Sequence, residues 1–557
     1  MSTTLSRCLT GLLAVLVAAV LAEPALAAAR QQPLIDAVKR GDVKAVRALI
    51  PKADVTAAEP DGTTALHWAA HANRADLAAL LIKAGAKVKT PNRYGATPFS
   101  LACLKGNAEV IELLLSHGED ANATLGNEHV LMMAARSGSV AAAKALLARG
   151  SNPNYAEPAQ HQTPLMWAAA RGNVEVVKTL LEAGAKVDAR SKAAPRDRVK
   201  ENSGRTPRIN DPLGLRANRD PSWSVSMEGL EFTPILWAAR AGHVDVVKAL
   251  LDAGANVNDA KTESVDTTAL TIAIMNHHWE LASLLLDRGA DPNRGPGYTA
   301  LHQLAWSRRL NHAFGPPHPE GSGSVGSLDL AKKLLEKGVN INAQATKSFR
   351  DGYRNRFNRV GATAFMMAAK LVDLPMMQLL VGAGADIHIK NDDLDTPLMV
   401  AAGVALHNPQ EDAGTEGEVL AAVKYLYDLG FDINAVNTNN ETAMHGAAYR
   451  GFNGVAQFLF EKGAKFDVAN LLGWTPLSIA DGLFFTGFYK AAPQTAELLR
   501  KFYADKGMAI PALPKVNDTS LLTLDKKAAE IYNDVLRQEA ERVSKDAEPK
   551  SQGDKKK

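Results

Sequence analysis

Apolar residues recur along this chain with helical spacing, in a repeat of about 33 residues. The copy at 233–258, TPILWAARAGHVDVVKALLDAGANVN, predicts two short helices and a return loop. Thr233 can cap the first helix, Gly242 would end it, and Gly254 is placed to end the second in a left-handed conformation. Each helix has only one apolar face, so a single repeat cannot bury its own core. The pattern therefore predicts repeats that stack on one another.

The start of this repeat occurs at twelve places, of which the first is partial and the fourth degenerate. They are Pro33, Thr64, Thr97, His129, Thr163, Thr233, Thr268, Thr299, Thr363, Thr396, Thr442 and Thr475. This period, with a T-P-L-H-x-A signature such as TALHWAA and TPLMWAA, resembles the ankyrin repeat over 33–507. The resemblance implies an all-α solenoid of about twelve helix–turn–helix repeats with β-hairpin finger loops between them. It also implies protein binding through the fingers and the first helices.

Five longer insertions interrupt the repeat array, which is assigned to 28–507. They are 190–232, 346–360, 307–327, 403–418 and 481–493. The first two fall between repeats, on the side where ankyrin repeats project their fingers. The other three fall between the first and second helix of one repeat. After the array, 508–545 is predicted to form a linker and a C-terminal amphipathic helix, and 546–557 a disordered tail.

The N-terminal residues 1–27 have the pattern of a signal peptide. Arg7 precedes the apolar run 12–21, and a small-residue cleavage site ends at Ala27. The pattern looks bacterial and predicts a periplasmic or secreted protein without a transmembrane segment after cleavage. The mature chain then keeps one cysteine, Cys103, which excludes an internal disulfide and is predicted to be a buried small hydrophobe.

Charge is balanced over the whole chain, with 63 basic and 60 acidic residues and a net charge of +3, so it indicates no partner class. It is uneven locally. Residues 190–219 hold nine basic and three acidic residues, and 347–360 hold five basic residues, one acid and three aromatics. The finger side is therefore predicted to be a basic edge. The candidate partner-binding residues on it are Arg196, Arg198, Arg205, Arg208, Trp223, Arg350, Tyr353, Arg354, Arg356 and Phe357.

The resemblance favours a non-catalytic interaction scaffold that acts outside the cytoplasm, binds a protein on its concave and finger face, and is a monomer. A second interpretation is a polyanion-binding protein that holds anionic lipid, envelope polymer or nucleic acid through the basic loops. Export makes nucleic acid the unlikely member of that class. A third is an enzyme whose site is built from the insertions. Salt dependence of binding separates the second interpretation from the first.

No catalytic, cofactor or metal site is predicted. Gly321, Gly323 and Gly326 have G-x-G-x-x-G spacing, but the preceding residues, with three prolines, cannot form the buried strand that a dinucleotide site requires. The spacing is interpreted as a flexible turn. No G-x-S-x-G nucleophile motif is present.

Two recurring side-chain types are interpreted as structural. His67 and His71 stand four residues apart, but His67 shares its repeat position with His302 and His445, which predicts a repeated hydrogen bond rather than a zinc site. Three tryptophans, Trp68, Trp167 and Trp237, also share one position. Other repeats hold apolar residues such as Leu101 and Met133 there, so this position is predicted to lie in the core. Asn107, Ser139 and Asn173 are predicted to cap second helices.

Overall fold

The structure, a computed structural model, describes residues 32–192, 231–260, 267–309, 323–347, 357–406, 413–482 and 491–511. The predicted signal peptide, C-terminal helix and tail lie outside these residues. Within the described residues, no helix is both long enough and apolar enough to cross a membrane.

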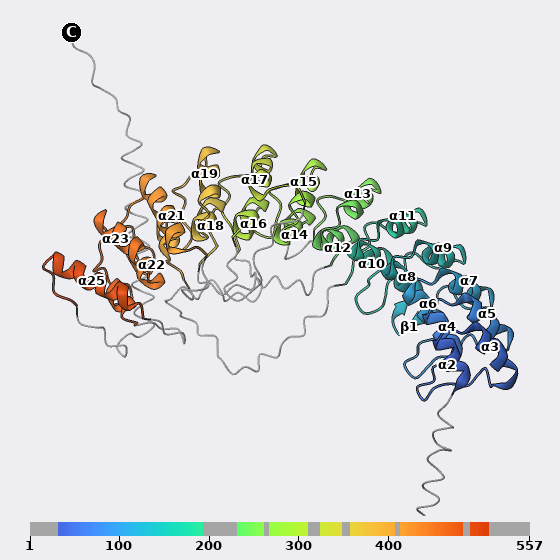
Figure 1. The fold of residues 1–557 in the computed structure, drawn as a ribbon. Helices are drawn as coiled ribbons and strands as arrows, with labels where there is room; N and C mark the ends of the chain where they lie inside the picture. Colours follow the sequence, from blue (N-terminus) through green and yellow to red (C-terminus); the bar gives the residue numbers. More distant parts are fainter. Residues whose placement is uncertain are drawn as a thin grey trace, which may run out of the picture. The chain divides into compact units, whose positions relative to one another are not determined.

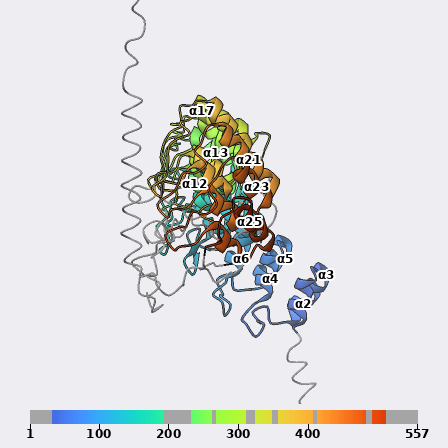
Figure 2. The ribbon, with the colours of Figure 1, turned by 90° about the vertical axis from the view of Figure 1, so that its left-hand side faces the viewer.

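The chain divides into two compact units. The N-terminal unit consists of the described residues 32–192 and 231–255, and the C-terminal unit consists of those from 256 to 511. In each unit the first helices of the repeats form one row and the second helices form another (Figure 1). Figure 2 shows the two helices of a repeat side by side, α2 with α3 and α4 with α5.

The N-terminal unit contains six helix pairs in its described residues. Its first helices are α2 (Pro33–Lys39), α4 (Ala65–His71), α6 (Pro98–Lys105), α8 (Val130–Ser137), α10 (Pro164–Arg171) and α12 (Pro234–Ala241). Its second helices are α3 (Val43–Leu49), α5 (Ala75–Lys83), α7 (Ala108–Ser116), α9 (Val140–Ala148), α11 (Val174–Glu182) and α13 (Val244–Asp252). A short 3-10 helix, η1 (Ile50–Lys52), follows α3. One finger forms an antiparallel strand pair, β1 (Thr124–Leu125) with β2 (Glu128–His129).

The C-terminal unit also contains six helix pairs in its described residues. Its first helices are α14 (Ala269–Met275), α16 (Ala300–Ser307), α18 (Ala364–Lys370), α20 (Pro397–Ala402), α22 (Ala443–Arg450) and α24 (Pro476–Ala480). Its second helices are α15 (Trp279–Asp287), α17 (Ser327–Glu336), α19 (Leu374–Gly382), α21 (Glu416–Asp428), α23 (Asn453–Glu461) and α25 (Pro493–Asp505). The predicted all-α solenoid of about twelve repeats is confirmed.

Local sequence sets where the helices begin and end. Thr97 has an extended backbone, and its Oγ accepts a hydrogen bond from the Ser100 N–H at 3.1 Å. The Ser100 hydroxyl accepts in return from the Thr97 N–H at 2.9 Å, which completes a capping box. At the other end of α6, Gly106 has a φ of 72°, a left-handed conformation that glycine adopts without strain.

The core of each repeat lies between its two helices and the neighbouring repeats. On α4, Leu66 and Ala69 are fully buried against Leu77 and Leu81 of α5, in the same repeat. Neighbouring first helices contact one another, as α4 does α2 and α6. Cys103 belongs to this core: it is fully buried, and burial holds the pKa of its thiol well above the usual value. The prediction that Cys103 is a buried small hydrophobe agrees with its position.

The recurring histidines are structural, as predicted. In His67, Nδ1 accepts from the Thr64 N–H at 3.1 Å, and Nε2 lies 3.0 Å from the Ala96 carbonyl oxygen of the next repeat. Since a carbonyl oxygen can only accept, Nε2 carries the proton and donates. His302 and His445 have the same arrangement, with Nε2 3.1 Å from the Ala362 oxygen and 3.2 Å from the Trp474 oxygen. Each imidazole therefore joins two repeats while neutral.

Of the three residues predicted to cap second helices, the serine does so and the two asparagines do not. Ser139 does cap α9, because its Oγ accepts from the Ala142 N–H at 3.2 Å. Asn107 and Asn173 instead donate from Nδ2 to carbonyl oxygens in the first helix of the preceding repeat, Ala70 of α4 at 2.6 Å and Ala135 of α8 at 2.8 Å. Carbonyls in the last turn of a helix lack intrahelical donors, so the longer amide side chain serves them rather than its own helix.

Candidate functional site

Most of the predicted partner-binding residues lie outside the described residues. They are Arg196, Arg198, Arg205, Arg208, Trp223, Arg350, Tyr353, Arg354 and Arg356. Phe357 is described, and it differs from the prediction of a partner contact: it is only 3% exposed. Its ring stacks on Trp306 of α16, with ring centroids 6.2 Å apart, and the Arg359 guanidinium lies 3.9 Å from the centroid of the same indole. Phe357 and Arg359 therefore pack within the C-terminal unit.

The three repeated tryptophans are half-buried, so the prediction that they belong to the core is wrong. Trp68, Trp167 and Trp237 each occupy position four of a first helix, counted from its first residue. Position two points into the core, and position four lies about 200° around the helix from it, away from the second helix. The cover of an indole at position four therefore depends on its neighbouring repeats as well as on side chains of its own repeat.

The C-terminal unit fills the same position differently. Position four of its first helices holds Ile272, Gln303, Met367, Val400, Gly446 and Ile479, and all of these are buried. Among the described residues, half-exposed tryptophans at position four thus occur only in the N-terminal unit, in three of its six repeats.

The residue at position seven of one first helix can lie over the residue at position four of the first helix in the next repeat. Lys39, at position seven of α2, places its Nζ 4.5 Å from the Trp68 ring centroid. Arg136, at position seven of α8, places its guanidinium 5.2 Å from the Trp167 ring centroid. A cation over an aromatic face is held by the ring quadrupole. Carboxylates fix both cations, since Glu59 lies 2.5 Å from Lys39 and Glu128 lies 3.0 Å from Arg136.

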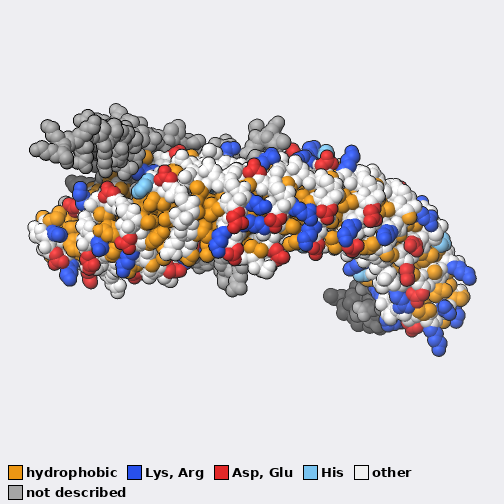
Figure 3. Space-filling view, turned by 90° about the horizontal axis from the view of Figure 1, so that it is seen from above, with side chains coloured by type: hydrophobic (Ala, Val, Ile, Leu, Met, Phe, Trp, Pro, Cys, Tyr) orange, Lys and Arg blue, Asp and Glu red, His pale blue; other side chains and the backbone are white. Residues whose placement is uncertain are grey.

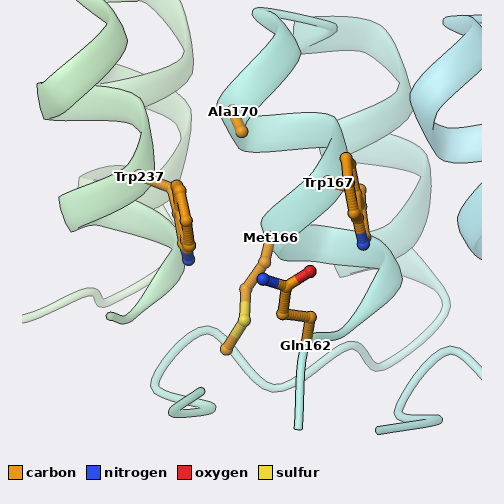
Figure 4. Close-up of a pocket in the computed structure, with 5 residues that line it drawn as sticks. All are labelled: Gln162, Met166, Trp167, Ala170 and Trp237. Carbon is orange, nitrogen blue, oxygen red and sulfur yellow. The ribbon is translucent and has the colours of Figure 1, made fainter. Parts of the chain in front are cut away.

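The third tryptophan lacks such a cover, and a pocket lies in its place. Position seven of α10 is Ala170, whose methyl group is too short to reach across the Trp237 ring. The pocket has a volume of about 50 Å³ and is lined by Gln162, Met166, Trp167, Ala170 and Trp237. Figure 4 shows the two indoles edge-on, one on α10 and one on α12, with Met166 and the Gln162 amide between them.

The surroundings of the pocket are apolar with a cationic rim. Phe232 packs beside Trp237, with ring centroids 4.9 Å apart, and Arg240 lies 5.9 Å from the Trp237 centroid. Neither indole Nε1 donates a hydrogen bond to the described residues. The only polar side chain in the lining is the Gln162 amide, and no carboxylate lines the pocket. The arrangement suits the binding of an uncharged group rather than catalysis.

A row of basic residues accompanies the tryptophans. Every first helix of the N-terminal unit has one in its last turn: Lys39, His71, Lys105, Arg136, Arg171 and Arg240. We call these six residues the cation row. The only acidic residue in these helices is Asp36. Arg171 and Lys105 are exposed, and neither forms a salt bridge with the described residues. The first-helix face of this unit is therefore positive.

Helix dipoles do not account for this row. Cations favour helix C-termini by about 0.3–1 kcal/mol, and that preference would apply to both rows of helices. The second helices of the same unit have a basic last turn only on α3 and α5, and their six basic residues are balanced by seven acidic ones. Figure 3 views the molecule from above Figure 1, and on that face basic and acidic side chains are interspersed.

The C-terminal unit contains a different polar cluster, which is enclosed. Lys370 and Asp395 are each 1% exposed. The Asp395 carboxylate accepts from Asn437 Nδ2 at 2.8 Å and Asn391 Nδ2 at 2.9 Å, and Lys370 Nζ donates to the Val404 carbonyl at 3.0 Å. Burial raises the pKa of Asp395, while the two asparagines and the charge of Lys370 act in the opposite direction. A partner cannot reach this cluster, so its role is structural.

Metal chemistry finds no support in the part of the chain that the structure describes, because no group of three or more His, Cys, Asp or Glu side chains there could hold an ion. The pocket beside Trp237 is thus the strongest candidate site. Sequence reasoning missed it, although comparing position seven of each repeat with position four of the next would have singled out Ala170.

Comparison with known families agrees with the repeat pattern. The family described as ankyrin repeats (3 copies) matches residues 34–125, 118–191, 217–296, 235–313 and 413–482. The single ankyrin repeat matches 360–392. The chain belongs to the ankyrin-repeat family. Ankyrin repeats generally mediate protein–protein interaction, and the fold is typically non-catalytic.

Similar proteins share the repeats rather than the whole chain. The ankyrin repeat and KH domain-containing protein mask-1 of Caenorhabditis elegans is 30% identical over 38% of this chain and 8% of its own length. The human transient receptor potential cation channel subfamily A member 1 is 22% identical over 76% of this chain and 32% of its own. The human ASB11 ankyrin repeat domain matches in structure with a TM-score of 0.37 and 27% identity, over 47% of this chain and all of that one.

This chain spans less than a third of the length of the first two relatives. Both are eukaryotic proteins, and the bacterial, exported character indicated by residues 1–27 stays a prediction.

Proposed function

We propose that this ankyrin-repeat protein is a non-catalytic interaction scaffold whose protein partner binds the first-helix face of the N-terminal unit. The observation that carries the proposal is the pocket between Trp167 and Trp237, two half-exposed tryptophans in neighbouring repeats. Tryptophan offers a large contact area at a small entropic cost and is enriched among the residues that dominate binding energy.

The basic insertion 190–232 begins and ends next to this pocket. Ser191 N–H donates to the Phe232 carbonyl at 2.9 Å, and the Phe232 N–H donates to Ser191 Oγ at 2.8 Å. These bonds hold the two ends of the insertion together, and the Phe232 ring lies against Trp237. The predicted binding residues Arg196, Arg198, Arg205, Arg208 and Trp223 remain part of the proposal, because the described ends of the insertion that contains them meet beside the pocket. Arg350, Tyr353, Arg354 and Arg356 remain proposed contacts on the second basic insertion.

Replacing Trp237 by alanine is expected to weaken partner binding by at least tenfold, because truncation of a central aromatic contact costs about 2 kcal/mol or more. The measurement is affinity capture from an extract of the source cells, followed by titration of the captured partner. Lys248→Ala, on the second helix of the same repeat, is the control and should bind normally. If Trp237→Ala retains the partner as well as wild type does, the proposed face is not the binding site.

A second candidate function is binding of a polyanion such as anionic lipid or envelope polymer, and the cation row favours it. Binding of that kind releases counterions, so the affinity should fall by orders of magnitude between about 50 and 200 mM salt. It would not depend on the shape of the tryptophan pocket, which separates the two functions.

We further propose that the protein acts outside the cytoplasm, on the strength of residues 1–27. Expression in a bacterial host followed by cell fractionation tests this. The expected product lies in the periplasm or medium and begins at Ala28, as read by N-terminal sequencing. A cytoplasmic product that retains residues 1–27 would contradict export.

A further inference from the structure

The size and lining of the pocket define the group that fits it. The walls are two indoles, a thioether, a methyl group and one neutral amide, that of Gln162, so the group must be uncharged and mainly apolar. A protein cavity of about 150 Å³ holds a benzene molecule. This pocket, with about 50 Å³, is smaller than an aromatic ring needs and matches a short aliphatic side chain such as leucine, valine or proline.

A cationic group is disfavoured at the same place. No carboxylate lines the pocket, and the cations of Arg136 and Arg240 already lie over the faces of its two indoles. A lysine or methylated ammonium placed between the rings would meet two like charges, and the pocket lining offers no carboxylate to pair with it. The anchoring side chain is therefore neutral.

The cation row defines what flanks that side chain. Arg136, Arg171 and Arg240 lie on α8, α10 and α12, the first helices of three successive repeats on both sides of the pocket. Packed helices lie about 8–10 Å apart, and an extended chain advances about 3.3 Å per residue. A carboxylate at every third residue of an extended segment would therefore match one cation per repeat.

We propose that the tryptophan pocket binds an extended acidic segment of the partner protein, which inserts one short aliphatic side chain between Trp167 and Trp237. Its acidic residues lie three apart and pair with Arg136, Arg171 and Arg240. This inference rests on the proposed function and adds the chemistry of the partner to it.

The direct test uses the full mature chain and a fluorescein-labelled thirteen-residue peptide. The peptide has leucine at its centre, glutamates three residues apart at positions −4, −1, +2 and +5 relative to the leucine, and serine elsewhere. Anisotropy at about 50 mM salt should show binding. Replacing the leucine by serine, or all glutamates by glutamine, should each weaken binding by at least tenfold. Equal binding of the leucine and serine peptides would overturn the proposal, since the pocket would then contribute nothing.

The Ala170→Arg variant distinguishes the contribution of the pocket to peptide binding from that of the positive charge. The substitution places at position seven of α10 the residue that Arg136 supplies in α8, where it covers the next tryptophan without disturbing the helix. We expect an unchanged thermal melt and at least tenfold weaker binding of the leucine peptide, although the face has gained a positive charge. Equal or stronger binding of that peptide would show that charge alone attracts it, and would overturn the inference.

Arg171→Glu is the complementary variant. Arg171 is exposed and does not line the pocket, so the substitution alters charge and leaves the pocket intact. The leucine peptide should bind at least fivefold more weakly and with a smaller dependence on salt. Inorganic polyphosphate is the comparison probe, and it should bind Ala170→Arg at least as well as wild type. If the native partner is lost from Trp237→Ala but the glutamate–leucine peptide does not bind wild type, this inference fails and the proposed function stands.

Discussion

Replacing Lys370 by methionine is expected to lower the free energy of unfolding by about 3–5 kcal/mol. The Lys370 ammonium is enclosed, donates to the Val404 carbonyl and attracts the buried Asp395 carboxylate. Methionine keeps the length and apolar stem of the side chain. It leaves Val404 without this donor and Asp395 without this counter-charge. Urea unfolding followed by circular dichroism measures the change.

Lys39 gives a matched control, because it occupies the same repeat position on α2 but is exposed. Its ion pair with Glu59 lies at the surface, and surface ion pairs contribute about 0–1 kcal/mol. Lys39→Met should therefore change stability by less than 1 kcal/mol. If both variants lose a similar amount of unfolding free energy, the buried contacts of Lys370 do not stabilise the fold more than the surface contacts of Lys39.

Acidification from pH 6.5 to pH 4 is expected to destabilise the C-terminal unit. Burial lowers the pKa of both His302 and His445 to about 4, against about 6.5 in an unfolded chain. The unfolded chain therefore binds more protons in this range, so the stability is fully present above pH 6.5 and declines as the pH approaches 4. Each imidazole contributes on the order of 3 kcal/mol of this loss. Protonation of Nδ1 would also remove the acceptor for the Thr299 or Thr442 N–H.

The measurement is the urea midpoint as a function of pH, compared with that of a variant carrying His302→Ser and His445→Ser. Serine already fills this position in two other repeats, as Ser100 and Ser478, so the capping box survives. The variant should be less stable at pH 7 but should lose the part of the dependence between pH 4 and 6.5 that these two histidines contribute. His67 and His129 of the N-terminal unit, whose pKa burial also lowers, keep theirs. Carboxylates with lowered pKa, such as Asp287, act mainly below that range. An unchanged dependence in the variant would exclude the histidines as its source.

Repeat architecture followed from the sequence because its determinants are local. Thr97 and Ser100 lie within one helical turn of each other, and Gly106 ends its own helix. The role of His67 was also predictable, because a polar residue recurring at one position of a packed helix implies a partner that recurs with it. Neither inference needed knowledge of which repeats touch.

The asparagines were assigned wrongly for the opposite reason. A cap is a contact within one helix, and Asn107 and Ser139 look equivalent at that level. The amide of Asn107 reaches the Ala70 carbonyl of the previous repeat, whereas the shorter Ser139 hydroxyl cannot span that distance and turns to its own helix. Only the spacing of stacked repeats decides between the two.

Sequence by itself determined that this chain forms stacked helix pairs, where the first helices begin, that a recurring histidine is structural, and that basic charge gathers at the insertions. Only the tertiary structure decided which tryptophan is left uncovered and borders a pocket that a partner can fill. Whether a tryptophan at position four is covered depends on the residue that the preceding repeat places over it, and for Trp237 that residue is Ala170, on the far side of a long insertion. Burial is a relation between neighbours in space, so no pattern read within one repeat could reveal the pocket.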